Sequence, residues 1–161
     1  MSSYQLIVYG ATSFVGQLLT RYLFERHGVN GALQWAIAGR SQSKLNELRQ
    51  SLGSTAQALP IVLADAADEA ALTAMCQQTK VVVSTVGPYV LYGSTLVKVC
   101  AHTGTDYCDL TGEPQWIAQM IEQYEAIAQK NGARIVHCCG FDSIPSDLGT
   151  YYLQQQAQQQ F

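Results

Sequence analysis

The segment from Tyr4 to Gly16, YQLIVYGATSFVG, constrains the fold most, because an apolar run leads directly into a glycine turn and a helix-like stretch. In dinucleotide-binding proteins one glycine permits the tight turn off the strand, and another lets the helix pack close to the sheet. N–H groups at the start of such a helix face the pyrophosphate. Gly10 and Gly16 have these places, so the segment predicts a nucleotide site; the alternative is an ordinary strand-to-helix turn.

The spacing of this turn differs from the usual pattern. Its form GxxxxxG is one residue longer than GxGxxG, and Ser13 stands where a middle glycine is expected. Ser13 places a Cβ where a phosphate would approach. Its hydroxyl could hydrogen-bond the phosphate or cap the helix.

Composition limits the classes of partner. The chain has 161 residues, 48% hydrophobic and 13% charged, enough for one domain with a full core. A net charge of −3 provides no basic field to attract nucleic acid or anionic membranes. No apolar run approaches the roughly 18 residues of a membrane span. Five cysteines without a CxxC pair favour buried free thiols over a disulfide framework or zinc site, and therefore a cytoplasmic protein.

Strand-like and helix-like segments alternate along the chain. Continuous apolar runs lie at 5–9, 34–39, 59–64, 81–86, 106–110 and 133–138, and helical candidates at 14–27, 42–52, 68–79, 91–103, 114–131 and 146–158. This pattern predicts a Rossmann-type α/β fold, a doubly wound parallel sheet of about six strands in the order 3-2-1-4-5-6. Ligands then bind outside the carboxyl ends of the first and fourth strands, where residues 10–16 and 84–93 should face one crevice.

The end of the chain differs in composition from the rest. After the last predicted helix begins, the sequence becomes a glutamine-rich tail. We expect residues 1–150 to form a dinucleotide-binding domain, and residues 151–161 to be a tail or the start of a truncated second domain. A dehydrogenase of this type normally needs such a domain to bind its small-molecule substrate.

The second predicted strand ends in AGRSQSK, a basic and hydroxylated stretch. Proteins specific for NAD commonly have an acidic residue here, whereas Arg40 could bind a 2′-phosphate bidentately and Ser41 and Lys44 could assist. This favours NADP over NAD. The alternative is a solvated Arg40 with Ser41 acting only as a helix cap. Asp65, after the third strand, could contact adenine or ribose, or simply cap the next helix.

The fourth predicted strand ends in STVGPYVLYGS. Gly87 and Pro88 force a turn there, which would bring backbone near the nicotinamide ribose. Tyr89 and Tyr92 follow this turn. Either could donate a proton or stack on a ring, but packing in the core or in a lid is the commoner role of such tyrosines.

Five motifs in order, GATSFVG, AGR, STVGPYVLYG, GTDYCDLTGE and GFDSIPSD, resemble the N-terminal domain of the saccharopine dehydrogenase-like oxidoreductases. This family includes trans-acting enoyl reductases. The resemblance spans residues 4 to about 150, and the last three motifs discriminate better than the glycine turn. It implies an NADP-binding Rossmann domain followed by a larger substrate and dimerisation domain.

The resemblance also implies site residues. It places the 10–16 turn at the pyrophosphate, Arg40 at the 2′-phosphate and residues 85–87 near the nicotinamide. Together with the strand-end residues above, the candidate cofactor-binding residues are Gly10, Ala11, Thr12, Ser13, Phe14, Val15, Gly16, Arg40, Ser41, Lys44, Asp65, Thr85, Val86 and Gly87.

Polar residues after the fifth and sixth predicted strands have two possible roles. The resemblance places Asp109, Thr111, Glu113, Asp142 and Ser143 along the substrate side of the cleft. A structural alternative remains open for the polar residues of these loops. In that alternative Thr111 and Glu113 cap the 114–131 helix, while Ser146 and Asp147 cap the last one.

Other residues carry weaker signals. His137, Cys138 and Cys139 fall in the sixth predicted strand, where alternating side chains cannot form one compact metal site, so core packing is expected. We expect no metal. Catalytic residues are not assigned.

The leading hypothesis is the cofactor domain of an NADP-dependent oxidoreductase that transfers hydride with a small or lipid-derived carbonyl, imine or enoyl substrate. A non-catalytic NADP(H)-binding or sensor module is the alternative. A short-chain dehydrogenase is disfavoured because no tyrosine has a lysine four residues later. Apolar surface left for a second domain could promote self-association, including a homodimer.

Overall fold

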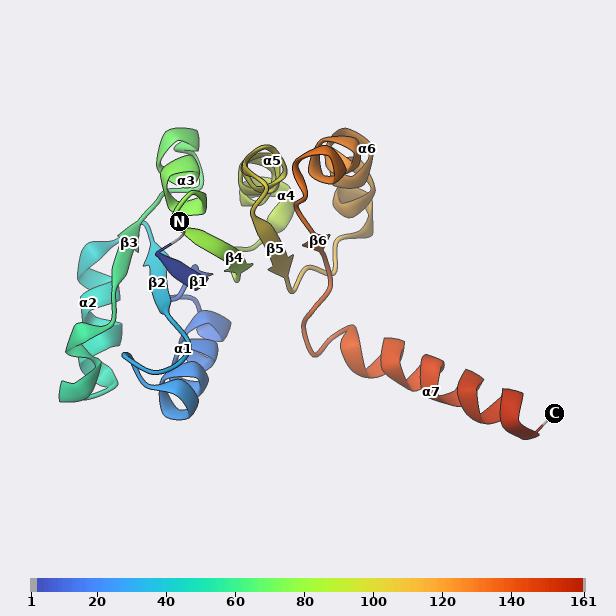
Figure 1. Cartoon of the computed structure of the whole chain (residues 1–161), viewed down its shortest axis with the longest axis horizontal. Helices are drawn as coiled ribbons and strands as arrows, with labels where there is room; N and C mark the ends of the chain where they lie inside the picture. The colour runs from blue at the N-terminus through green and yellow to red at the C-terminus, as the bar shows by residue number, and fades with distance from the viewer. Residues whose placement is uncertain (1–2, 161) are drawn as a thin grey trace.

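The computed structural model describes residues 3–160 and has six parallel strands in one sheet, with helices on both faces (Figure 1). The strand order is β3-β2-β1-β4-β5-β6, which confirms the predicted doubly wound sheet. The strands are β1 (Tyr4–Tyr9), β2 (Trp35–Gly39), β3 (Ile61–Leu63), β4 (Thr79–Ser84), β5 (Asp106–Asp109) and β6 (Ile135–Val136).

Alternate residues of β1 face the two layers of helices. Val8 packs into a core with Ile37 and Leu45 under the first two helices, whereas Ile7 packs with Val82 under the later ones. Both sides of each central strand are therefore buried, as continuous apolar runs predict. The helices are α1 (Phe14–His27), α2 (Gln42–Ser51), α3 (Glu69–Cys76), α4 (Tyr89–Tyr92), α5 (Ser94–Thr103), α6 (Pro114–Asn131) and α7 (Ile144–Gln160), with a 3-10 helix, η1 (Ser54–Ala58).

The helix predicted at 91–103 is divided into α4 and α5 at Gly93. The Trp116 ring of α6 packs against this junction, and its Nε1 donates a hydrogen bond to Ser94 Oγ at 2.9 Å. A Cβ on Gly93 would lie 2.6 Å from Trp116 Cζ2. The close approach of the indole therefore requires glycine between the two helices.

The sixth strand is shorter than predicted. β6 ends at Val136, and Cys138 has a φ of 61°, which a strand cannot accommodate. The backbone N–H groups of Cys138 and Cys139 turn toward Asp109 instead. The expectation that residues 137–139 lie in the strand is therefore wrong, although His137 does pack in the core with a side chain only 9% exposed.

The last helix leaves the body of the domain. α7 extends away from the sheet (Figure 1), and none of its described side chains is buried. It begins at Ile144, so Ser146 and Asp147 lie inside its first turn and are not the cap that was expected. The helix continues through the glutamines to Gln160, beyond its predicted end at 158; Phe161, like Met1 and Ser2, lies outside the described residues.

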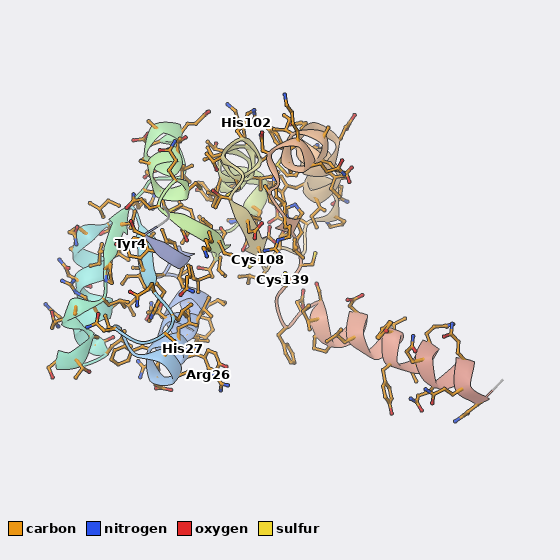
Figure 2. The ribbon with its side chains drawn as sticks, in the orientation of Figure 1. Tyr4, Arg26, His27, His102, Cys108 and Cys139 are labelled. Carbon is orange, nitrogen blue, oxygen red and sulfur yellow. The ribbon has the colours of Figure 1, made fainter. Side chains whose placement is uncertain are left out.

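The thiols differ in environment. Cys76 and Cys100 are buried with their Sγ atoms 3.7 Å apart, as expected for core cysteines. Cys139 is exposed, which contradicts the expectation of uniformly buried thiols. It lies close to Cys108 (Figure 2), whose thiol pKa is raised to about 11, mainly by burial.

Candidate functional site

A cavity of about 430 Å³ lies at the carboxyl ends of the central strands. We call it the β1–β4 cavity. Its lining comes from the turns after β1, β2, β3 and β4, so the predicted crevice at the topological switch point is present. The lining residues are Tyr9, Gly10, Thr12, Ser13, Gly39, Arg40, Asp65, Ala66, Ala67, Thr85, Val86, Gly87 and Tyr92.

The turn after β1 is tied to the end of β4. Gly10 has a φ of 81°, and a Cβ there would lie 2.5 Å from Val86 Cγ2 and 2.9 Å from Thr85 Oγ1. The Thr85 hydroxyl donates to the Gly10 carbonyl at 2.9 Å and lies 3.0 Å from Ser13 Oγ. Glycine is therefore required both by backbone conformation and by the close approach of the two strand ends.

The start of α1 carries free backbone donors beside this cavity. Ser13 is the N-cap, and its Oγ accepts from the Gly16 N–H at 3.0 Å. Within residues 3–160 the N–H groups of Thr12, Phe14 and Val15 have no backbone partner. The positive end of the helix and its unpaired donors make this turn suitable for an anion.

Gly16 brings α1 close to the strand. A Cβ on Gly16 would collide with the Gly10 carbonyl oxygen and lie 2.8 Å from Ala11 Cα. Ala11 itself is completely buried. Gly16 and Ala11 therefore shape the turn from behind and do not line the cavity.

Arg40 follows β2 directly and is exposed at the rim of the cavity, where it is the only Lys or Arg among the lining residues. Asp65 follows β3 and also lines the cavity. Its Oδ1 accepts a hydrogen bond from the Ala67 N–H at 2.9 Å. Burial raises the pKa of the Tyr9 hydroxyl, and the nearby Asp65 charge adds to this rise. The site thus combines one guanidinium with one carboxylate.

The flanks of this region form helix caps. Ser41 caps α2, with its Oγ 3.4 Å from the Lys44 N–H, and Lys44 is exposed. Asp68 caps α3 through the Ala71 N–H, so the capping role considered for Asp65 belongs to Asp68. Ser41 and Lys44 are near Arg40 in sequence but do not line the cavity.

The turn after β4 carries two tyrosines with different environments. Tyr89 is buried, donates to the Ser84 carbonyl at 3.0 Å and accepts from the Leu110 N–H at 3.3 Å. Tyr89 therefore packs in the core, as expected for such a tyrosine, and this burial raises its pKa to about 12. Tyr92 is 47% exposed and lines the cavity. The Gly87–Pro88 peptide bond between strand and tyrosines is cis.

The Glu113 carboxylate binds the backbone of this turn. Its Oε1 accepts from the Tyr89 N–H at 2.7 Å and its Oε2 from the Val90 N–H at 2.8 Å. Glu113 is the N-cap residue of α6 by position, but its side chain makes no capping hydrogen bond to that helix and caps α4 instead. Both carboxylate oxygens have protein donors.

Asp109 is the centre of a buried network. Its Oδ2 accepts from Tyr107 Oη at 2.9 Å and from His137 Nδ1 at 2.7 Å. Its Oδ1 accepts from the Thr111 and Cys138 N–H groups, each at 3.1 Å. Because a carboxylate only accepts, His137 carries its hydrogen on Nδ1. Asp109 is completely buried and bonded within the protein, so it does not face a substrate.

The comparisons with known proteins agree with this geometry. Residues 6–136 match the family described as the saccharopine dehydrogenase NADP-binding domain. This match covers most of the chain. The chain belongs to this family. It is an NADP-binding domain with a Rossmann fold, as the five motifs indicated.

Named relatives give a finer comparison. A Mycobacterium tuberculosis protein provisionally named a trans-acting enoyl reductase is 47% identical over 156 residues, 97% of this chain and 36% of the relative. A Caenorhabditis elegans protein named lipid droplet localized protein is 40% identical over 159 residues, 96% of this chain and 37% of the relative. The chain thus spans little more than a third of the length of these curated relatives.

A solved structure supports the fold. The apo saccharopine dehydrogenase (L-Glu forming) of Saccharomyces cerevisiae superposes with a TM-score of 0.69 at 20% identity, covering 87% of this chain and 28% of that one. No helix within residues 3–160 is long and apolar enough to cross a bilayer.

In this NADP-binding domain the structure gathers eight of the fourteen cofactor candidates in one cavity. They are Gly10, Thr12, Ser13, Arg40, Asp65, Thr85, Val86 and Gly87. The other six, Ala11, Phe14, Val15, Gly16, Ser41 and Lys44, lie beside or behind it. Sequence reasoning missed Tyr9, Gly39, Ala66 and Ala67 as lining residues, although each is the last residue of a strand or follows one closely.

Proposed function

We propose that the β1–β4 cavity holds NADP(H), with the pyrophosphate at the turn of residues 10–16 and the 2′-phosphate at Arg40. The supporting observation is the group of unpaired N–H groups at the start of α1, beside a Gly10 turn that packs too closely on Thr85 and Val86 to admit a side chain. An anion there would meet backbone donors and the helix dipole. The residues present therefore fit the cofactor that the family binds.

Further roles follow from position. We assign the adenosine half to the region of Arg40, Ser41, Lys44 and Asp65, and the nicotinamide half to residues 85–87. Ala11, Phe14, Val15 and Gly16 shape the phosphate turn. Arg40 offers a planar pair of donors for a phosphate, which Lys44 would supplement as a point charge.

When bound, the nicotinamide supplies the hydride chemistry. The chain contributes orientation, because Thr85 locks the β1 turn to the β4 end and Glu113 fixes α4, which carries Tyr92 to the cavity. We propose a carbonyl, imine or enoyl substrate, small or lipid-derived. The name of the Mycobacterium tuberculosis relative supports the enoyl class.

We propose that the substrate site includes residues outside this chain. We propose that residues 1–150 are the NADP-binding unit, that residues 151–161 lead into a second domain, and that substrate binds between the two. The length of the relatives supports this division. We further propose a cytoplasmic location and no nucleic-acid partner. We also propose that apolar surface left for a second domain allows a homodimer.

One observation favours a second candidate function, a non-catalytic NADP(H)-binding or sensor module. The carboxylates of Asp109 and Glu113 are both bonded to protein donors, so neither is free to act on a substrate. A sensor needs only the cofactor cavity. Turnover of an enal, imine or ketone by the longer protein would separate an enzyme from a sensor.

Replacing Arg40 with alanine tests the cofactor assignment. We expect NADPH affinity to fall by about 5- to 150-fold, the equivalent of about 1–3 kcal/mol for a lost charge-assisted hydrogen bond. NADH affinity should change little, because NADH lacks the 2′-phosphate. Titration followed by nicotinamide fluorescence measures both values.

The matched control is Arg26→Ala, which removes another exposed arginine at the far end of α1. Its NADPH affinity should equal that of the wild type. Equal losses for NADPH and NADH in Arg40→Ala would contradict the 2′-phosphate assignment.

A further inference from the structure

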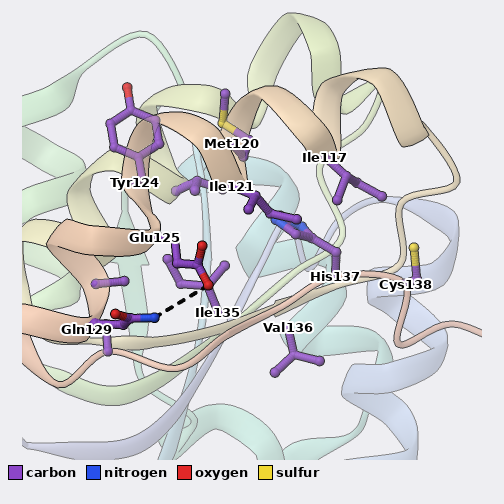
Figure 3. Close-up of a pocket in the computed structure, with 13 residues that line it drawn as sticks. Ile117, Met120, Ile121, Tyr124, Glu125, Gln129, Ile135, Val136, His137 and Cys138 are labelled. Atoms are coloured by element: carbon purple, nitrogen blue, oxygen red, sulfur yellow. Dashed lines mark hydrogen bonds between the residues drawn. The ribbon is translucent and has the colours of Figure 1, made fainter.

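A second cavity, separate from the proposed nucleotide site, lies between α6 and the edge strand β6 (Figure 3). We call it the α6–β6 cavity. Its volume is about 530 Å³, and none of its lining residues lines the β1–β4 cavity. Most of the wall is apolar, formed by Ile117, Met120, Ile121 and Tyr124 of α6 and by Ile135 and Val136 of β6.

His137 supplies an unpaired polar atom to this apolar wall. Its Nδ1 is bonded to Asp109, and its side chain is about nine-tenths buried, at 9% exposure. Within residues 3–160, His137 Nε2 has no hydrogen-bond partner, and it is not completely buried. Because His137 lines the cavity, Nε2 is accessible from there. The Trp116 ring, 5.1 Å away and edge-on, holds the imidazole in place.

The Asp109 carboxylate determines how His137 Nε2 can interact with a ligand. Asp109 occupies Nδ1, so Nε2 is the ring nitrogen left for a ligand. An imidazole whose one hydrogen is on Nδ1 accepts a hydrogen bond at Nε2, so we take the ligand head group to be a donor. The lining also contains Glu125, whose carboxylate bonds Gln129 at 3.4 Å, and no lysine or arginine. An anionic head would meet this negative charge without a compensating cation.

From these observations we propose that the α6–β6 cavity binds an apolar molecule with a single neutral hydroxyl, which donates to His137 Nε2. A mostly apolar wall with a few polar groups, in a volume between about 300 and 1,000 Å³, is the usual form of a small-molecule site. The hydrocarbon part lies along Ile121 and Val136, which are 49% and 53% exposed without a ligand. This site is independent of the proposed cofactor.

Three probes of equal chain length test the proposal by protein NMR titration. They are 1-octanol, its isomer 1-methoxyheptane, which cannot donate, and octanoate, which is anionic. We expect saturable chemical-shift changes at α6 and β6 with 1-octanol. The other two probes should bind at least about fivefold more weakly, the scale of one lost hydrogen bond. NADPH affinity should be unchanged by octanol.

Two variants localise the binding. Ile121→Glu places a charge on the cavity wall at an exposed position, and should weaken octanol binding at least about tenfold. Leu18→Glu is the matched control, because Leu18 is 55% exposed on α1 and far from this wall in sequence and fold. It should leave octanol affinity unchanged.

Several results would overturn the proposal. They are the absence of saturable octanol shifts, equal affinities for the alcohol and the ether, tighter binding of octanoate, or unchanged octanol affinity in Ile121→Glu. Light scattering gives another: a wild-type oligomer that Ile121→Glu dissociates would mean that a second copy covers the cavity.

Discussion

Asp109→Ala should lower the free energy of unfolding by about 3–5 kcal/mol, because several buried donors would lose their acceptor, at a cost of about 1–3 kcal/mol each. The carboxylate is completely buried and accepts from four donors. Its removal leaves His137 Nδ1, the Tyr107 hydroxyl and two backbone N–H groups without partners in a dry environment. Urea unfolding followed by circular dichroism measures the loss.

Asp106→Ala is the control for Asp109→Ala on the same strand. Asp106 pairs with Arg134, which lowers the pKa of the carboxyl, but the guanidinium is 81% exposed. We therefore expect a loss of at most about 1 kcal/mol. If Asp109→Ala cost no more than Asp106→Ala, the four-donor network would not exist in solution.

Gly10→Ala should weaken NADPH and NADH binding by about 100-fold or more, the equivalent of about 2.7 kcal/mol. The new Cβ would lie 2.5 Å from Val86 Cγ2 and 3.2 Å from the Thr85 carbonyl carbon, so the β1 turn and the β4 end must separate. That separation would displace the backbone donors that face the phosphate.

Gly28→Ala separates this effect from backbone strain. Gly28 has a φ of 64°, and a Cβ there meets nothing within 4 Å. Both variants place a Cβ at a positive φ, which side chains rarely adopt, and should lose about 1–3 kcal/mol of stability from that strain. Only Gly10→Ala should lose the cofactor, and retained NADPH binding by that variant would place the phosphate elsewhere.

The sheet could be predicted from the sequence because its strands are buried on both faces. Runs such as LIVY and WAIAG are then continuously apolar, and their alternation with helical segments leaves few parallel topologies. The cavity could be predicted for a related reason. Gly10 and residues 85–87 follow strands that must lie next to each other at the switch point.

Partners distant in the chain could not be predicted. Glu113 precedes α6 directly and has the sequence of an ordinary cap, but its carboxylate binds Tyr89 and Val90, more than twenty residues earlier. Asp109 reaches His137, which is 28 residues later, and the same carboxylate turns the chain out of β6. These hydrogen-bond partners depend on how distant helices and strands pack together, which the local spacing of residues does not reveal.

Calorimetric titration of the wild-type chain with NADPH and NADH, side by side, tests most directly whether the β1–β4 cavity is an NADP(H) site. We predict saturable binding of NADPH at one site, with NADH about 5- to 150-fold weaker because it lacks a phosphate for Arg40. No binding of either dinucleotide, or equal affinities for both, would contradict the site proposed here.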